Sequence, residues 1–253
     1  LEEYVVKKLV ENGWVEGKSA NYDQQRCLYP EDVITWVKKT QPEVFSKLEK
    51  LNAADTERVI LNRLEKELGA KTGGTMSVIR NGFKITGAGN IIMSKKAPED
   101  ARNPDEIAKY KSNILRVVRQ LKYNPAREFS IDLVFFINGI PVSTVELKTD
   151  FTQSIDEAVK QYKEDRKPVQ HGRKEPLLTV KRGAVVHFAM SDSQIQMATE
   201  LKGDSTYFLP FNKGNDGSYP DKKVSENVGE NDEYPVAYFW EEVCKWDNWL
   251  RIF

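Results

Sequence analysis

Asp132, Glu146 and Lys148 stand out because they are charged residues inside two otherwise apolar runs of sequence. The runs are rich in β-branched and aromatic residues, and the Asn138-Gly139 pair between them is typical of a tight β-hairpin. Burying charge in such a ribbon is costly, and two carboxylates about 4 Å apart repel by roughly 4 kcal/mol at an effective dielectric of 20. A divalent cation between them would remove that repulsion. The pattern therefore predicts a metal site with a lysine beside it, although charges on a half-exposed sheet are the alternative interpretation.

The strand register decides whether these groups can meet. Side chains alternate along a strand, so the two charged residues of the second run share one face. A simple two-residue turn would pair Asp132 with Val145 and point its carboxylate away from Glu146. A three-residue turn with a bulge would pair Asp132 with Thr144 and bring all three charges to one face. The chemistry predicts this bulged turn, with Gly139 in the left-handed region, or a compensating bulge elsewhere.

An Asp on one strand and Glu-x-Lys on its partner resemble the motif of the PD-(D/E)xK nuclease superfamily. Over nearly its whole length, the chain also resembles the N-terminal nuclease portion of the restriction subunit of type I restriction endonucleases. The resemblance implies a restriction-endonuclease-like α/β fold, a twisted mixed β-sheet flanked by helices, with helical and hairpin additions at the N-terminal side. The stretches that carry it are residues 21–23, 40–43, 78–84, 115–120, 130–148, 181–188 and 208–214.

The resemblance implies a type I site-specific deoxyribonuclease that cuts double-stranded DNA with Mg²⁺. Asp132 and Glu146 would hold the ion, with the backbone carbonyl of Leu147 and waters completing its shell. Lys148 would orient the attacking water or stabilise charge on the phosphate oxygens. By the same resemblance Gln161, on the following helix, would be a further catalytic residue.

Two further positions carry both a functional and a plainer interpretation. Glu2 matches a glutamate of relatives that aids metal binding, but the helix dipole alone favours an acidic residue at a helix start. Gln161 is either a site residue or a solvated helix glutamine. Many relatives have a Tyr about four residues after this Gln; here Tyr162 follows it directly, and Asp165 and Arg166 fall near the expected place. Ile131 stands where the motif name has proline.

Basic residues flank the hairpin in the sequence and are candidates for contact with DNA phosphates. Solvated faces are the common alternative for such clusters. The chain has 38 Lys and Arg against 38 Asp and Glu, so any DNA-binding surface must come from an uneven distribution of charge. The candidates are Arg116, Arg119, Lys122, Arg166, Lys181 and Arg182.

Several classes of site are disfavoured by the sequence. Two Cys and two His without zinc spacing argue against a zinc site and favour a reducing cytoplasm. No run approaches the roughly 18 apolar residues of a membrane span. The Gly-rich stretch at 69–75 lacks phosphate-loop spacing, and ATP is expected only at the motor of the full-length subunit. His187 lies in an apolar strand and is interpreted as a core histidine.

Hydrophobic periodicity and turn residues divide the chain further. We expect a nuclease domain at 1–235, comprising a catalytic core at about 105–210 with the N-terminal helix and an elaboration over 13–104. Residues 236–253 are expected to form a connecting helix toward a motor domain. A second Asn-Gly pair at 81–82 predicts a short hairpin over 78–85, with an extension to 91–93 as an option. The predicted helices cover residues 2–12, 30–37, 42–51, 54–68, 104–118 and 152–166.

The resemblance also implies partners, namely double-stranded DNA and the methylation and specificity subunits of a restriction-modification complex. Two other functions remain as alternatives. One is a non-catalytic DNA-binding or docking module that keeps the nuclease fold, and the other is a repair or junction-resolving nuclease of the same superfamily. The intact set of Asp132, Glu146 and Lys148 favours a catalytic module over the docking module.

Overall fold

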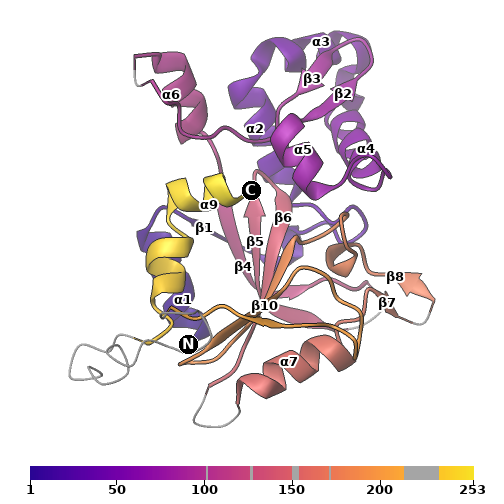
Figure 1. Ribbon diagram of the computed structural model, residues 1–253. Helices are drawn as coiled ribbons and strands as arrows, with labels where there is room; N and C mark the ends of the chain where they lie inside the picture. Colours follow the sequence, from indigo (N-terminus) through magenta and orange to yellow (C-terminus); the bar gives the residue numbers. More distant parts are fainter. Residues whose placement is uncertain (101, 126–127, 150–153, 171, 214–233) are drawn as a thin grey trace.

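A seven-stranded mixed β-sheet forms the centre of the protein in a computed structural model (Figure 1). The structure describes residues 1–100, 102–125, 128–149, 154–170, 172–213 and 234–253. The β1–β4 and β6–β9 pairs are parallel, and the other neighbours are antiparallel. The sheet order is β1 (Val15–Gly17), β4 (Leu115–Lys122), β5 (Ser130–Ile137), β6 (Ile140–Leu147), β9 (Val186–Met190), β10 (Ile195–Ala198) and β11 (Leu209–Pro210).

Helices cover both faces of this sheet, as the restriction-endonuclease-like fold class predicts. Leu133 and Phe135 of β5 face the larger core with α1 (Glu2–Glu11), whereas Val134 and Phe136 face a second core under α7 (Ile155–Glu164). Both cores are made of buried hydrophobic residues, and β5 contributes apolar side chains to each of them. Of the charged residues of the hairpin, Glu146 is fully buried, and Asp132 and Lys148 are partly exposed.

The N-terminal additions form a separate group of elements at the turn end of the hairpin (Figure 1). Residues next to these elements form hydrogen bonds with the turn. Tyr29 donates its backbone N–H to the carbonyl oxygen of Gly139 (2.8 Å), and Asn138 Nδ2 donates to Met93 O (2.8 Å). Gly139 has φ +84°, and a Cβ there would lie 2.5 Å from Tyr29 O, so the turn requires glycine. The additions are α2 (Pro30–Thr40), α3 (Pro42–Asn52), α4 (Thr56–Leu68), α5 (Thr75–Asn81), β2 (Phe83–Ile85) and β3 (Gly89–Ile91).

Two predicted elements are wrong. The expected helix over 104–118 ends early as α6 (Pro104–Lys111), and the remainder is β4. The helical spacing of Ile107, Tyr110 and Ile114 continues to Val117, so hydrophobic periodicity extended the predicted helix into the strand. The expected hairpin over 78–85 is the end of α5, where Gly82 caps the helix with φ +72°. The hairpin itself lies later, between β2 and β3.

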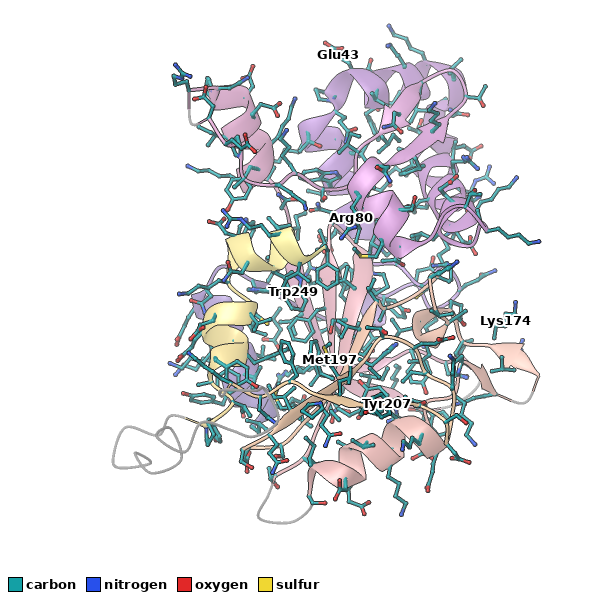
Figure 2. All side chains as sticks on the ribbon, viewed as in Figure 1. Glu43, Arg80, Lys174, Met197, Tyr207 and Trp249 are labelled. Carbon is teal, nitrogen blue, oxygen red and sulfur yellow. The ribbon has the colours of Figure 1, made fainter. Side chains whose placement is uncertain are left out.

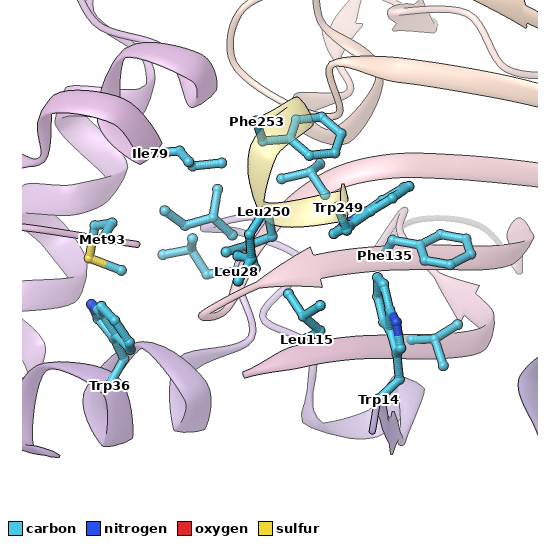
Figure 3. Packing of buried hydrophobic residues seen from close by; sticks show 14 of the residues in the cluster. Trp14, Leu28, Trp36, Ile79, Met93, Leu115, Phe135, Trp249, Leu250 and Phe253 are labelled. Carbon is cyan, nitrogen blue, oxygen red and sulfur yellow. The ribbon is translucent and has the colours of Figure 1, made fainter. Parts of the chain in front are cut away.

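The C-terminal residues pack into the larger core. They form a π-helical turn, η4 (Phe239–Val243), and α9 (Trp246–Ile252), where one continuous helix was expected. The Trp249 ring lies 5.4 Å from those of Trp14 and Phe135, and Figure 3 shows these rings together. Arg80 joins α5 to this segment by donating to Phe253 O at 3.0 Å (Figure 2). The proposed domain boundaries remain predictions.

Among the described residues, no helix has the length and apolar character that crossing a membrane requires.

Candidate active site

A bulge in the hairpin brings the two acidic residues opposite each other. Ile137 pairs with Ile140 across a two-residue turn in which Asn138 and Gly139 both have positive φ. The register then shifts between Phe135 and Phe136, because Val142 is an extra residue on β6. The ladder continues from Leu133 and Val145, which places Asp132 opposite Glu146. The predicted three-residue turn, which pairs Asp132 with Thr144, is wrong, whereas the positive φ at Gly139 and the compensating bulge elsewhere in the hairpin are confirmed.

Glu146 is fully buried and has one free oxygen. Its Oε1 accepts a hydrogen bond from Arg166 Nε at 2.6 Å. Its Oε2 is buried and has no hydrogen-bond partner among the described residues. Burial raises the pKa of Glu146 to about 8 even with Arg166 beside it, and the nearby Asp132 carboxylate raises the pKa further. With a pKa of about 8, Glu146 is mostly protonated at neutral pH in the metal-free site, and a divalent ion beside Oε2 would favour its ionised form.

Asp132 is held by a donor on each of its oxygens. Oδ2 accepts the backbone N–H of Leu147 (2.7 Å), and Oδ1 accepts Gln120 Nε2 (3.0 Å). The same Gln120 Nε2 donates to Glu2 Oε2 (2.8 Å), and Gln120 Oε1 accepts from Ser130 Oγ (2.8 Å). Glu2 therefore lies at the site, one side chain away from Asp132.

Gln120 was not predicted as a site residue. It has φ +45°, a conformation that is costly for a residue with a Cβ. Its neighbours Arg119 and Leu121 pair with Leu133 and Ile131, so Gln120 lies opposite Asp132. Only the strand pairing, which the sequence leaves open, reveals this position.

Lys148 completes the charged set from the residue after β6. Its backbone N–H donates to Met190 O at 2.9 Å, which continues the pairing with β9. Alternation along the chain then places its side chain on the face of Glu146. The side chain is half-buried, and its ammonium has no ion-pair partner among the residues that the structure describes.

The residues present fit a hard divalent ion. Two carboxylates lie together, one with a buried, unpartnered oxygen, and carboxylate oxygens are the ligands that Mg²⁺ prefers. Within the described part of the chain, no group of three or more His, Cys, Asp or Glu side chains could hold a metal ion. A bound ion would therefore need carbonyl, water or phosphate oxygens as well. The carbonyl of Leu147 remains the predicted source of one.

Gln161 and Tyr162 point in different directions because one helical step turns a side chain by about 100°. Tyr162 is fully buried in the interface between α7 and the sheet, and its hydroxyl is bonded to Thr144 Oγ1 (2.8 Å). Its ring packs against His187 and Phe208. Gln161 Oε1 is buried without a partner among the described residues, so its catalytic role stays a prediction.

His187 is a core histidine, as predicted. Its Nδ1 is hydrogen-bonded to Thr144 Oγ1 at 2.7 Å, and the side chain is buried. Burial lowers the pKa of His187 to about 3, which keeps the imidazole neutral.

Two of the basic residues that were predicted to bind DNA are instead buried in ion pairs. Arg116 donates to both carboxylate oxygens of Asp32 (2.6 and 2.7 Å), and its guanidinium lies 4.2 Å from the centre of the Tyr29 ring. Arg166 is paired with Glu146. Only 11% and 6% of these two side chains are exposed, which disfavours phosphate contact, and their role in DNA binding stays a prediction.

The other basic candidates lie nearer to solvent. Arg119 is paired with Glu16 at 2.8 Å, and Lys122 with Glu128. Lys181 is exposed, whereas Arg182 is partly buried: its Nη2 donates to Arg26 O, and its Nη1 is buried without a partner among the described residues. Lys181 and Arg182 line a cleft of about 620 Å³ together with other residues that include Lys71 and Lys174; Lys174 projects from β8 (Arg173–Lys174) at the edge of the molecule (Figure 2).

Comparison with protein-family models matched residues 2–206 to the family described as type I restriction enzyme R protein N terminus. The matched range includes every candidate site residue from Glu2 to Arg182. Comparison with curated proteins gave no match.

Proposed function

Because the chain belongs to the family of type I restriction enzyme R protein N-terminal regions, we propose that it is a Mg²⁺-dependent endonuclease module that cuts double-stranded DNA. The observation that carries the proposal is the pairing of Asp132 with Glu146, whose buried Oε2 lacks a partner among the described residues. A docking module would have no use for such a costly pair. Lys148 lies on the same face, and its ammonium has no ion-pair partner in the described part of the chain, which supports a catalytic role.

Asp132 and Glu146 would hold the Mg²⁺ ion, together with the Leu147 carbonyl and Glu2 as further candidates. When bound, the ion would polarise the scissile phosphate and lower the pKa of a water molecule. The donors of Leu147 and Gln120 fix the Asp132 carboxylate before any ligand arrives, so little reorganisation is needed.

Lys148 would act on the phosphate itself. Its ammonium can donate to the attacking water or to the non-bridging oxygens, on which negative charge builds up as the phosphodiester is hydrolysed. Gln161 would position the water or the DNA backbone from the start of the last turn of α7. Tyr162, held by Thr144, would supply packing.

DNA would be held mainly through its phosphates by the basic residues that remain near solvent. We infer that Lys181 and Arg182, with Lys71 and Lys174 in the same cleft, form one contact. Arg119 and Lys122 form another next to Gln120. Such contacts position a duplex without reading its sequence.

Sequence recognition and translocation would come from elsewhere in the restriction-modification complex. We propose that the R protein adds an ATP-driven motor, and that methylation and specificity subunits select the site. An enzyme that acts on DNA inside the cell would work in the cytoplasm.

The test is cleavage of supercoiled plasmid by the complete enzyme with Mg²⁺ and ATP. Asp132→Ala, Glu146→Ala and Lys148→Met should each abolish cleavage while ATP hydrolysis and translocation continue, because the three act at a site separate from the motor. Lys39 is an exposed lysine of α2. The Lys39→Met variant serves as the matched control and should cleave DNA at the wild-type rate. Cleavage at the wild-type rate by any of the three variants would refute the assignment, and DNA binding without cleavage by the wild type would favour a docking module.

A further inference from the structure

Arg166 donates hydrogen bonds to two oxygen atoms at the centre of the candidate active site, both of which could otherwise bind a metal ion. Its Nε donates to Glu146 Oε1 at 2.6 Å, and its Nη2 donates to the backbone carbonyl of Ser130 at 2.7 Å. A carboxylate oxygen and a backbone carbonyl are the kind of ligand pair that binds a hard divalent ion. The guanidinium therefore lies where such an ion could otherwise bind.

The position of Arg166 is fixed by its surroundings. Only 6% of its side chain is exposed, and its guanidinium carbon lies 6.0 Å and 5.9 Å from the ring centres of Tyr123 and Phe129. Its backbone N–H donates to Gln161 O at the C-terminal end of α7, where the helix dipole favours a positive charge. A side chain held by two aromatic rings, a helix end and a strand is part of the scaffold and does not behave as a mobile surface arginine.

We propose that Arg166 acts as a built-in cation in place of a second metal ion, so that the active site binds one divalent ion, on the Oε2 side of Glu146. The inference rests on the proposed metal-dependent nuclease function and adds the number of ions to it. Arg166 is a positioning residue in this scheme, because it acts through Glu146 and does not touch the substrate.

The balance of charge supports a single ion. With all carboxylates ionised, Asp132, Glu146 and the nearby Glu2 carry three negative charges. Arg166 and Lys148 carry two positive ones, so one divalent ion already makes the site positive by one charge. A second divalent ion would add two further positive charges that DNA phosphates must offset. A second ion near Oε1 would also lie beside the guanidinium, which repels it and leaves it no free carboxylate oxygen on that side.

The experiment counts Mn²⁺ ions bound to the metal-free chain, from the electron paramagnetic resonance signal of free Mn²⁺ during a titration. The Asp132→Ala variant gives the background of ions bound elsewhere. The wild type should bind one Asp132-dependent ion. Arg166→Met, which keeps the length of the side chain without its charge, should bind two, whereas Arg166→Lys, which keeps a cation, should bind one.

Two Asp132-dependent ions in the wild type would overturn the inference and leave the nuclease function intact. An unchanged count of one in folded Arg166→Met would also overturn it. The absence of any Asp132-dependent ion would instead contradict the proposed metal dependence itself. Circular dichroism and gel filtration show whether Arg166→Met folds; if it does not, the counts for the wild type and for Arg166→Lys still decide between one ion and two.

Discussion

Leu147 donates its backbone N–H to Oδ2 of Asp132 at 2.7 Å, across the two strands that the hairpin turn joins. This hydrogen bond comes from the residue between Glu146 and Lys148, so the backbone of the Glu-x-Lys segment orients the third charged residue. The contact exists only in the register that the Val142 bulge creates. The geometry of the site is therefore a property of the strand pairing as much as of the side chains.

Gln120 offers a test that separates backbone strain from function. Gln120→Ala and Gln120→Gly both remove the amide that joins Asp132 to Glu2, so both should weaken Mn²⁺ binding and slow DNA cleavage. Gly accepts φ +45° without a Cβ clash, so Gln120→Gly should be more stable than Gln120→Ala by about 1 kcal/mol. Urea denaturation measures this difference, and equal stability of the two variants would show that the backbone at 120 is unstrained.

The neighbouring residues Gln161 and Tyr162 should differ sharply in their effect on cleavage. Gln161→Ala should reduce it strongly. Tyr162→Phe should change it little, because the ring packing stays and only the hydrogen bond to Thr144 is lost, which costs about 1 kcal/mol of stability. Plasmid cleavage by the folded variants gives the ranking. The reverse order would mean that the tyrosine role seen in relatives has moved to position 162.

His187 should make the protein sensitive to mild acid. Its pKa is lowered to about 3 in the folded state against about 6.5 in the unfolded chain. The unfolded state therefore binds more protons as the pH falls below 6.5, and stability decreases by up to about 1.4 kcal/mol per pH unit.

The control for this effect is His187→Gln, which can still bond to Thr144 and does not titrate. Unfolding free energies of both proteins between pH 6.5 and 5 should show a steeper fall for the wild type. Parallel curves would mean that His187 is protonated, or is exposed, in the folded protein.

Arg116 should matter for stability and not for DNA binding. Arg116→Met leaves the buried Asp32 carboxylate without its partner, at a cost of about 3 kcal/mol or more. Adding Asp32→Asn removes the stranded charge and should restore part of the loss in urea denaturation. The DNA affinity of the folded single variant should depend on salt concentration as that of the wild type does. If the slope of log affinity against log salt concentration is smaller by about one, Arg116 does contact a DNA phosphate.

The two Asn-Gly pairs show why sequence reasoning succeeded at one hairpin and failed at another. At Asn138-Gly139 long β-branched runs lie on both sides, and the pair forms the expected turn. At Asn81-Gly82 the preceding residues form a short helix, and the same dipeptide supplies its C-cap. Positive φ at the glycine is common to both uses, whereas Asn138 has positive φ and Asn81 is helical, so the pair predicts the conformation of its glycine and not the element.

The acidic pair and the lysine could be found from residue types and spacing because burying charge needs a reason. Gln120 and Arg166 could not be identified in this way. Their roles depend on which strand lies beside Asp132 and on where α7 ends, and neither is encoded in the local pattern. Long-range pairing is the part of the site that the linear sequence leaves open.

The hydrogen bonds between the N-terminal additions and the hairpin turn limit how far this proposed nuclease module could be shortened for engineering. Asp132 lies seven residues from Gly139, roughly 20 Å along the strand, so the additions stand well away from the chemistry and look dispensable. Removing them would break two hydrogen bonds at the closed end of the hairpin. Gly139 O would lose the backbone N–H of Tyr29, and Asn138 Nδ2 would lose its acceptor, Met93 O. A minimal engineered version should therefore keep residues 28–98, or replace Asn138 and rebuild the turn.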